Sequence, residues 1–207
     1  MIVVVDYGVN NLASVVRALA AGGHEATLAA DPEVVRRASR VVMPGVGHFA
    51  RAAQNLAASG LGDAVREVAR SGRPVMGICL GMQLFFPTSE EAPGAAGLGL
   101  LEGTVRRFRT ELPVPHVGWA RVEPTAAGRA HGALAPVFPE GGSEFFYHVH
   151  SYHPDELPDG SALAFADYGE RFATIVGRGN VLGAQFHPEK SQRAGIGLLS
   201  AFAGWTP

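Results

Sequence analysis

The stretch Arg73-Pro74-Val75-Met76-Gly77-Ile78-Cys79-Leu80-Gly81 contains the only cysteine of the chain. Its first, apolar part predicts a buried strand, and the apolar residues that follow it, Met82–Phe86, predict a short helix. A cysteine between two glycines at such a sharp turn is the thiol counterpart of the G-x-S-x-G nucleophile elbow. The start of a helix also favours a thiolate through its N–H groups and its dipole. Taken alone, the motif is equally consistent with a buried structural cysteine.

The residues before this turn alternate between strand-like and helix-like segments. An Asp-Pro pair, Asp31-Pro32, predicts the beginning of a short helix, and two glycines after Ala21 predict the end of another. This order predicts an α/β fold, in which a parallel sheet carries helices on both faces. The predicted strands are Ile2–Asp6, Glu25–Ala30 and Arg40–Met43, and the longer predicted helices are Asn11–Ala21, Phe49–Ala58 and Gly62–Arg70.

The second half of the chain has a different pattern, with several strand-like segments and few helices between them. This pattern predicts antiparallel strands that pack onto the parallel core, and a last helix at Gln192–Trp205. The strand-like segments are Leu98–Phe108, His116–Val122, Phe145–His150, Ala162–Ala166, Phe172–Gly177 and Asn180–Phe186.

Composition narrows the function classes. The chain has 207 residues, of which 47% are hydrophobic and 17% charged, and its net charge is -2. This length and composition predict a single domain over residues 1–207, and the charge gives no reason to expect a nucleic-acid partner. The N-terminal residues lack the basic region of a signal peptide, and no apolar run is long enough to span a membrane. With a single cysteine and no disulfide framework, these features predict a cytoplasmic protein.

A thiolate nucleophile needs a base and a group that orients the base, and His187-Pro188-Glu189 offers both. Residues two apart in an extended segment face the same side, so the carboxylate can fix the tautomer of the imidazole. The alternative for this tripeptide is an ordinary surface turn. A second group of histidines, His148, His150 and His153, has spacing that a zinc site could use. No carboxylate lies among these three, so we favour polar residues near the substrate and expect no metal.

Together, Gly77–Gln83 and His187-Pro188-Glu189 resemble the triad-type, class I glutamine amidotransferases. That resemblance implies a flavodoxin-like sheet and a catalytic triad of Cys79, His187 and Glu189. Further motifs resemble the glutaminase subunits of imidazole glycerol phosphate synthases over the whole chain. These motifs are Asp6-Tyr7-Gly8-Val9-Asn10-Asn11-Leu12, Pro44-Gly45-Val46-Gly47-His48-Phe49, Pro115-His116-Val117-Gly118-Trp119 and His150-Ser151-Tyr152.

The resemblance implies that glutamine is hydrolysed to glutamate and ammonia through a thioester, without a cofactor. It implies a separate (β/α)8-barrel cyclase as the partner in a heterodimer, which uses the ammonia to make imidazole glycerol phosphate and an aminoimidazole carboxamide ribotide. The oxyanion donors that it implies are Leu80 and the loop around Val46 and Gly47. The substrate-binding residues are Gln83, Ser151 and Tyr152, and the hypothetical docking residues are Asn11, Trp119 and Lys190, the single lysine.

Two positions depart from the pattern of this family, and three other functions stay open. Asn10 stands where the family commonly has a glycine, and Ala120 stands where it often has an asparagine that we expect at the partner face. One alternative is the glutaminase of another biosynthetic pathway. Another is a non-catalytic interaction subunit with the same fold. The third is a hydrolase of other amides or peptides, against which Gln83 and the family motifs weigh.

Overall fold

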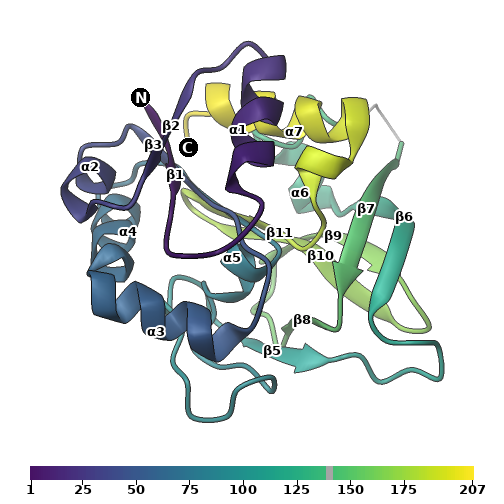
Figure 1. Cartoon of the computed structure of the whole chain (residues 1–207). Coiled ribbons are helices and arrows are strands. Elements are labelled where there is room, and N and C mark those ends of the chain that lie inside the picture. The colour runs from purple at the N-terminus through teal and green to yellow at the C-terminus, as the bar shows by residue number, and fades with distance from the viewer. Residues whose placement is uncertain (139–141) are drawn as a thin grey trace.

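The computed structural model describes residues 1–138 and 142–207. In this part of the chain nine strands form one sheet in the order β2-β1-β3-β4-β11-β10-β9-β6-β7 (Figure 1). Two further strands, β5 (Thr104–Arg107) and β8 (Tyr152–Asp155), pair with each other below that sheet. None of the helices described in these two ranges has the length and apolar character needed to cross a membrane.

One half of the large sheet is parallel and has the strand order of a flavodoxin-like fold, as predicted. Neighbouring residues of its strands point to opposite faces, so that Ile2 and Val4 lie in one hydrophobic core while Val3 and Val5 lie in the other. Its strands are β2 (Ala26–Ala29), β1 (Ile2–Val5), β3 (Arg40–Met43), β4 (Val75–Ile78) and β11 (Val181–Ala184).

Helices cover both faces of this parallel half. The core on one face contains α1 (Leu12–Ala21) and α7 (Gln192–Gly204). The other core contains α2 (Pro32–Arg36), α3 (Phe49–Ser59) and α4 (Leu61–Arg70). The predicted start of α2 is confirmed, because Asp31 Oδ1 accepts a hydrogen bond from the Glu33 N–H at 2.8 Å.

The other half of the sheet is antiparallel, and it continues the parallel half edge to edge. Its strands are β10 (Arg171–Arg178), β9 (Ala162–Asp167), β6 (His116–Pro124) and β7 (Glu144–His150). The predicted antiparallel strands are present, and they adjoin the parallel core by extending its sheet, because β10 pairs directly with β11. The predicted strand Asn180–Phe186 forms β11 over part of its length, antiparallel to β10 as predicted and, after a turn at Gly179, parallel to β4 on its other side.

The predicted strand Leu98–Phe108 is confirmed only at its end, in β5. The N–H groups of Leu98 and Leu100 donate to the carbonyls of Leu84 and Phe85, so the first residues pack along the segment after the cysteine turn. Gly99 and Gly103 have positive φ angles of 63° and 115°, which interrupt an extended strand. The sequence pattern also missed α6 (Ala126–Ala130), β8 and a 3-10 turn, η1 (Pro188–Lys190).

The two departures from the family pattern have different locations in the structure. Asn11, and not Asn10, takes the left-handed conformation at the start of α1, with φ 75°. Asparagine tolerates this conformation better than most residues do. Ala120 lies on the buried side of β6 and belongs to a hydrophobic core, so the expectation of a lost contact at the partner face was wrong.

Candidate active site

Cys79 lies on the sharp turn between β4 and α5 (Leu80–Gln83), with φ 52° and ψ -111°. A Cβ on Gly77 would be 2.5 Å from Cα of Met82, and a Cβ on Gly81 would be 1.8 Å from the Met43 carbonyl oxygen. Both glycines are therefore required by close packing of the backbone. This geometry is that of a nucleophile elbow. The predicted helix at Met82–Phe86 starts earlier, at Leu80, directly after the cysteine.

His187 and Glu189 follow β11, the strand next to β4. His187 Nδ1 donates to Glu189 Oε1 at 2.7 Å, and both side chains are buried. The Cys79 N–H donates to the Ala184 carbonyl at 2.8 Å, which fixes the two loops relative to each other. The structure therefore brings together the three residues of the predicted triad at the ends of adjacent strands.

The charges of Cys79 and Glu189 determine the protonation of His187. Burial alone lowers the pKa of an imidazole, but the interactions of His187 with Cys79 and Glu189 outweigh it and raise the pKa of His187 to about 10. Among the described residues, His187 Nε2 has no hydrogen-bond partner. At neutral pH His187 therefore favours its protonated form, the imidazolium.

Asn11, predicted to lie on a docking face, is bound within the chain. Its Nδ2 donates to Glu189 Oε1 at 2.5 Å, the same oxygen that accepts from His187. The two other hypothetical docking residues lie on one exposed surface. Trp119 is 46% exposed and its ring lies 6.1 Å from the Tyr147 ring, while Lys190 Nζ lies 5.8 Å from that ring.

A cavity of about 290 Å³ opens in front of the cysteine. Every residue that the sequence suggested for substrate or oxyanion binding lines it. These residues are Val46, Gly47, Leu80, Gln83, Ser151 and Tyr152, and the cavity wall also contains Glu91, Pro115, Val149 and His150. Gln83 Nε2 donates to the Tyr152 carbonyl at 3.0 Å and so connects the elbow helix to the opposite wall.

The Leu80 amide, a predicted oxyanion donor, already has an acceptor. Its N–H donates to the Gly45 carbonyl at 3.3 Å. A Cβ on Gly45 would be 2.4 Å from the Tyr7 hydroxyl, so the loop packs tightly at this point. The Tyr7 hydroxyl donates to the Pro44 carbonyl at 2.7 Å, and burial followed by the charge of Cys79 raises its pKa.

The three histidines that resembled a zinc site make other contacts. The Nδ1 atoms of His148, His150 and His153 lie 3.0, 2.8 and 2.9 Å from main-chain carbonyl oxygens, which fixes neutral tautomers with the proton on Nδ1. His148 Nε2 bonds to Thr174 Oγ1 at 2.9 Å, and the His148 ring stacks on His116. Within residues 1–138 and 142–207, no three or more His, Cys, Asp or Glu side chains are grouped to hold a metal ion.

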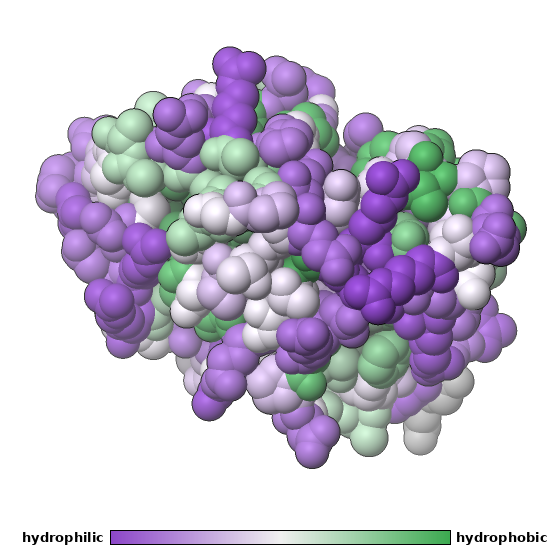
Figure 2. Space-filling view, turned by 90° about the horizontal axis from the view of Figure 1, so that it is seen from below, coloured by the Kyte–Doolittle hydropathy of each residue, from purple (hydrophilic) through white to green (hydrophobic). Residues whose placement is uncertain are grey.

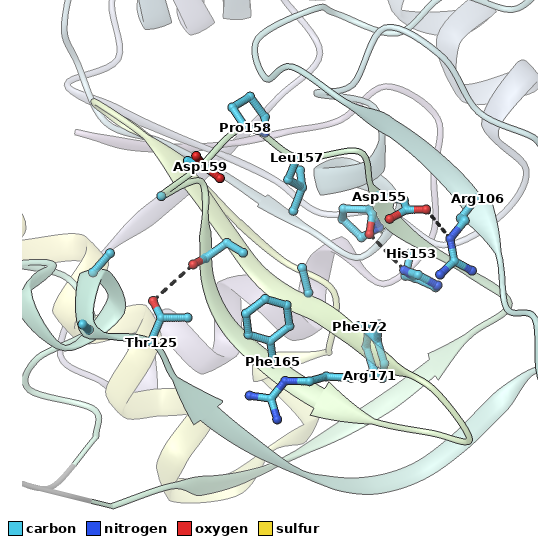
Figure 3. Close-up of a pocket in the computed structure, with 16 residues that line it drawn as sticks. Arg106, Thr125, His153, Asp155, Leu157, Pro158, Asp159, Phe165, Arg171 and Phe172 are labelled. Atoms are coloured by element: carbon cyan, nitrogen blue, oxygen red, sulfur yellow. Dashed lines mark hydrogen bonds and ion pairs between the residues drawn. The ribbon is translucent and has the colours of Figure 1, made fainter.

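A second cavity, of about 470 Å³, lies along β8, β9 and β10 (Figure 3). In its lining, Arg106 bonds to Asp155 and, at 2.7 Å, to Glu170. Thr125 supplies the only hydroxyl of its lining, and that hydroxyl accepts from the Gly128 N–H and donates to the Ala162 carbonyl. The face seen in Figure 2 is mixed, with hydrophilic residues spread over much of it and apolar residues in separate patches, one of them at its upper right edge.

Sequence reasoning missed two residues of the site. Gln185 is fully buried, and its Nε2 lies 3.7 Å from Cys79 Sγ. Glu91 lines the cavity, and its Oε2 accepts from the Phe49 N–H at 2.8 Å. A polar residue at the end of an apolar strand was the available signal for Gln185. For Glu91 no such signal exists, because it lies in a loop whose position depends on the whole fold.

Comparisons with known proteins agree with this geometry. The family model for class I glutamine amidotransferases matches residues 3–202. The imidazole glycerol phosphate synthase subunit HisH of Symbiobacterium thermophilum is 50% identical over 96% of this chain and 91% of its own length. HisH of Moorella thermoacetica is 44% identical over 97% and 93%.

A crystal structure of a glutamine amidotransferase has the same fold, with a TM-score of 0.75 and 21% identity over 97% of this chain and 98% of its own. These similarities agree with the geometry of the elbow and of the His187–Glu189 pair. The chain belongs to the class I glutamine amidotransferases and, within them, to the HisH subunits of imidazole glycerol phosphate synthase.

Proposed function

We propose that the chain, as one domain over residues 1–207, hydrolyses glutamine to glutamate and ammonia with Cys79 as nucleophile. The ammonia then serves a separate (β/α)8-barrel cyclase, which makes imidazole glycerol phosphate and an aminoimidazole carboxamide ribotide. The observation that carries the proposal is the elbow cysteine at the floor of a cavity of about 290 Å³, beside a buried His187–Glu189 pair. A cavity of this size suits a molecule as small as an amino acid.

The reaction proceeds in two halves. Cys79 Sγ attacks the side-chain amide carbon of glutamine, and as the C–N bond breaks His187 gives its proton to the nitrogen, which leaves as ammonia. His187 then takes a proton from water, whose oxygen attacks the thioester carbon, and the C–S bond breaks to release glutamate and a thiolate. Glu189 holds the imidazolium through its 2.7 Å hydrogen bond.

Each half forms an oxyanion, for which the Leu80 N–H is a donor at the start of α5. This donor becomes available only when the Gly45 carbonyl moves away from it, since the two are 3.3 Å apart. Rotation of the Gly45–Val46 peptide has that effect and turns the Val46 N–H toward the cavity in the same motion. We propose this rotation as the step that the partner subunit favours. Glycine at position 45 suits it, because a Cβ there would contact Tyr7 at 2.4 Å.

The far wall of the cavity suits the amino-acid end of the substrate. Glu91 is a carboxylate in that wall and is a natural partner for an ammonium group. Ser151, between β7 and β8, and Tyr152, the first residue of β8, line the same cavity. With the ammonium at Glu91, the side-chain amide of glutamine extends toward Cys79.

Trp119 and Lys190 flank Tyr147, and we propose that this exposed surface docks the cyclase barrel. The surface is connected to the site, because the Tyr147 carbonyl accepts from the His187 N–H at 2.9 Å. Asn11 contributes from beneath, through its hydrogen bond to Glu189. Two hydrogen bonds therefore connect the docking residues to the proposed triad: the bond from the His187 N–H to the Tyr147 carbonyl and the bond from Asn11 to Glu189.

Glutamate release from glutamine tests the proposal, measured for the chain alone and with a histidine-pathway cyclase barrel and its ribonucleotide substrate. We expect strong stimulation by the barrel. Glutamine hydrolysis without any response to the barrel would keep the chemistry and reject the partner, which would favour a glutaminase of another pathway. No glutamate under either condition would favour a non-catalytic subunit.

A further inference from the structure

Gln185 is a buried polar residue that the mechanism above does not use. It follows β11 directly, and its side chain has 0% exposure. Its N–H donates to the Thr174 carbonyl at 2.8 Å, and the Ala184 carbonyl before it accepts from the Cys79 N–H. The backbone of Gln185 is therefore fixed on both sides, next to the nucleophile.

The hydrogen bonds around Gln185 determine which end of its amide faces the sulfur. The Tyr152 carbonyl accepts from Gln83 at 3.0 Å, so the atom of Gln83 that faces it is Nε2. Gln83 Nε2 also donates to the Gln185 side chain at 3.1 Å, so the atom that accepts there is Oε1. The remaining end of the Gln185 amide is Nε2, which lies 3.7 Å from Cys79 Sγ.

The chain of contacts begins at a fixed point, because the Tyr152 carbonyl also accepts from His150 Nδ1 at 2.8 Å. A carbonyl held by two donors has little freedom to turn. The same chain uses both hydrogens of Gln83 Nε2, which leaves Gln83 only its Oε1 for a ligand. Gln83 therefore meets the substrate as a hydrogen-bond acceptor.

We propose that Gln185 is a further catalytic residue, whose side-chain N–H stabilises the thiolate of Cys79 and whose orientation is set by Gln83. A donor favours the charged form of the group that accepts from it, and the effect is larger in a buried site. Gln185 approaches the sulfur with an uncharged amide, so His187 remains the only proton carrier. Because Gln83 lines the substrate cavity, the chain also connects the bound glutamine to the sulfur.

This inference rests on the proposed glutaminase, but its test does not require turnover. Cys79 is the only cysteine, so the rate of alkylation by iodoacetamide reports on this thiol alone. We expect Gln185→Met, which removes the donor, to move the pH midpoint of alkylation upward by about one unit. Gln185→Glu should move it in the same direction. Gln54→Glu makes the same chemical change on the exposed side of α3 and should leave the midpoint unchanged.

Catalysis gives a second readout, because we expect either Gln185 variant to lower kcat about tenfold while KM changes less. A midpoint within about 0.2 units of the wild type in a folded Gln185→Met chain would overturn the inference. Wild-type chain that alkylates as expected but releases no glutamate with the barrel would instead reject the proposed function.

If both variants fail to fold, NMR spectroscopy of the wild-type chain still tests the inference. The NMR signals of the Gln185 side-chain amide should shift as Cys79 ionises and should stay constant over the same pH range in Cys79→Ala. Signals that do not respond to ionisation of Cys79 would contradict the inference.

Discussion

The parallel and the antiparallel halves of the sheet contribute different parts of the site. We assign the chemistry to the parallel half, where Cys79 follows β4, and His187 and Glu189 follow the neighbouring strand β11. The antiparallel half supplies the surroundings, since Ser151 follows β7 directly and Trp119 lies on the exposed side of β6. The boundary between the two halves runs between β11 and β10.

Burial explains this division. All four residues of β1, β4 and β11 are buried, so these strands offer only their ends to a substrate. In β6, by contrast, Ala120 and Val122 are buried while Val117 and Trp119 are exposed. A strand with one free face can present side chains to another protein, so we assign catalysis to strand ends and docking to a strand face.

The largest expected effect on activity comes from replacing Cys79, the proposed nucleophile in the parallel half. Cys79→Ala should lower kcat by at least about 10⁴-fold, since the loss of a triad nucleophile removes covalent catalysis. Ser151→Ala, in the cavity wall proposed to bind the amino-acid end of glutamine, should change kcat/KM by less than about tenfold. Steady-state glutamate release measures both. Similar losses for the two variants would contradict a division of labour between the halves.

A substitution at the elbow glycine Gly81 tests how tightly the backbone packs around Cys79. Gly81→Ala should lower the free energy of unfolding by about 3 kcal/mol or more, because the new Cβ would be 1.8 Å from the Met43 carbonyl oxygen. Gly197→Ala is the matched control, since a Cβ in that part of α7 meets nothing within 4 Å. Urea unfolding compares them, and equal stabilities would refute the packing argument.

The docking surface should respond to the loss of one exposed aromatic ring. Trp119→Ala should weaken barrel binding by about 2 kcal/mol, roughly thirtyfold, and should leave the glutamine hydrolysis of the isolated chain unchanged. Leu28→Ala is the control on β2 at the other edge of the sheet, where Leu28 is 45% exposed. Titration calorimetry with the barrel measures both. Equal affinities would move the docking site elsewhere.

A related test concerns the single lysine. Lys190→Ala should reduce the stimulation of glutaminase by the barrel and leave the fold intact, because Lys190 lies over Tyr147, whose carbonyl holds His187. Glutamate release with and without the barrel, together with thermal unfolding, measures this. Unchanged stimulation would remove Lys190 from the docking surface.

The buried histidines of the antiparallel half should make stability sensitive to acid. Burial lowers the pKa of His148 to about 3 and that of His116 to about 4. Their neutral forms contribute fully above pH 6.5, and this contribution is lost as pH falls from there toward the folded pKa values. His148→Phe should therefore reduce the loss of unfolding free energy between pH 7 and pH 5 by about 1 to 2 kcal/mol.

Urea unfolding at several pH values measures this dependence. His24→Gln, outside the cluster, is the control and should keep the pH dependence of the wild type. A His148→Phe chain with an unchanged pH dependence would show that His148 is not the group whose protonation is resisted.

The parallel half was well predicted because its patterns are local. The strand Arg40–Met43 was predicted at its observed ends, and the elbow followed from its two glycines and one cysteine. The antiparallel half was predicted less well, because pairing partners are set by contacts between distant residues. Nothing within Leu98–Gly103 indicates that its amides bond to the segment after α5.

Prediction of the candidate site was limited in the same way, by contacts between residues that are far apart in the sequence. Cys79, His187 and Glu189 stand out by residue type and spacing, so they could be proposed as a triad before the fold was known. The contact of Gln185 with the sulfur and that of Asn11 with Glu189 join residues that are 106 and 178 positions apart. Such pairs depend on the order of the strands, which residue spacing alone does not encode.

The proposal that Cys79 is the nucleophile is tested most directly by trapping a thioester on its sulfur. The complex of the chain with its barrel would be mixed with glutamine, quenched in acid, and analysed by mass spectrometry of intact chain and of peptides. We predict a γ-glutamyl adduct on the peptide that contains Cys79, released by hydroxylamine and absent from Cys79→Ala. Glutamate release in the absence of any such adduct, or with the adduct on another residue, would contradict the account.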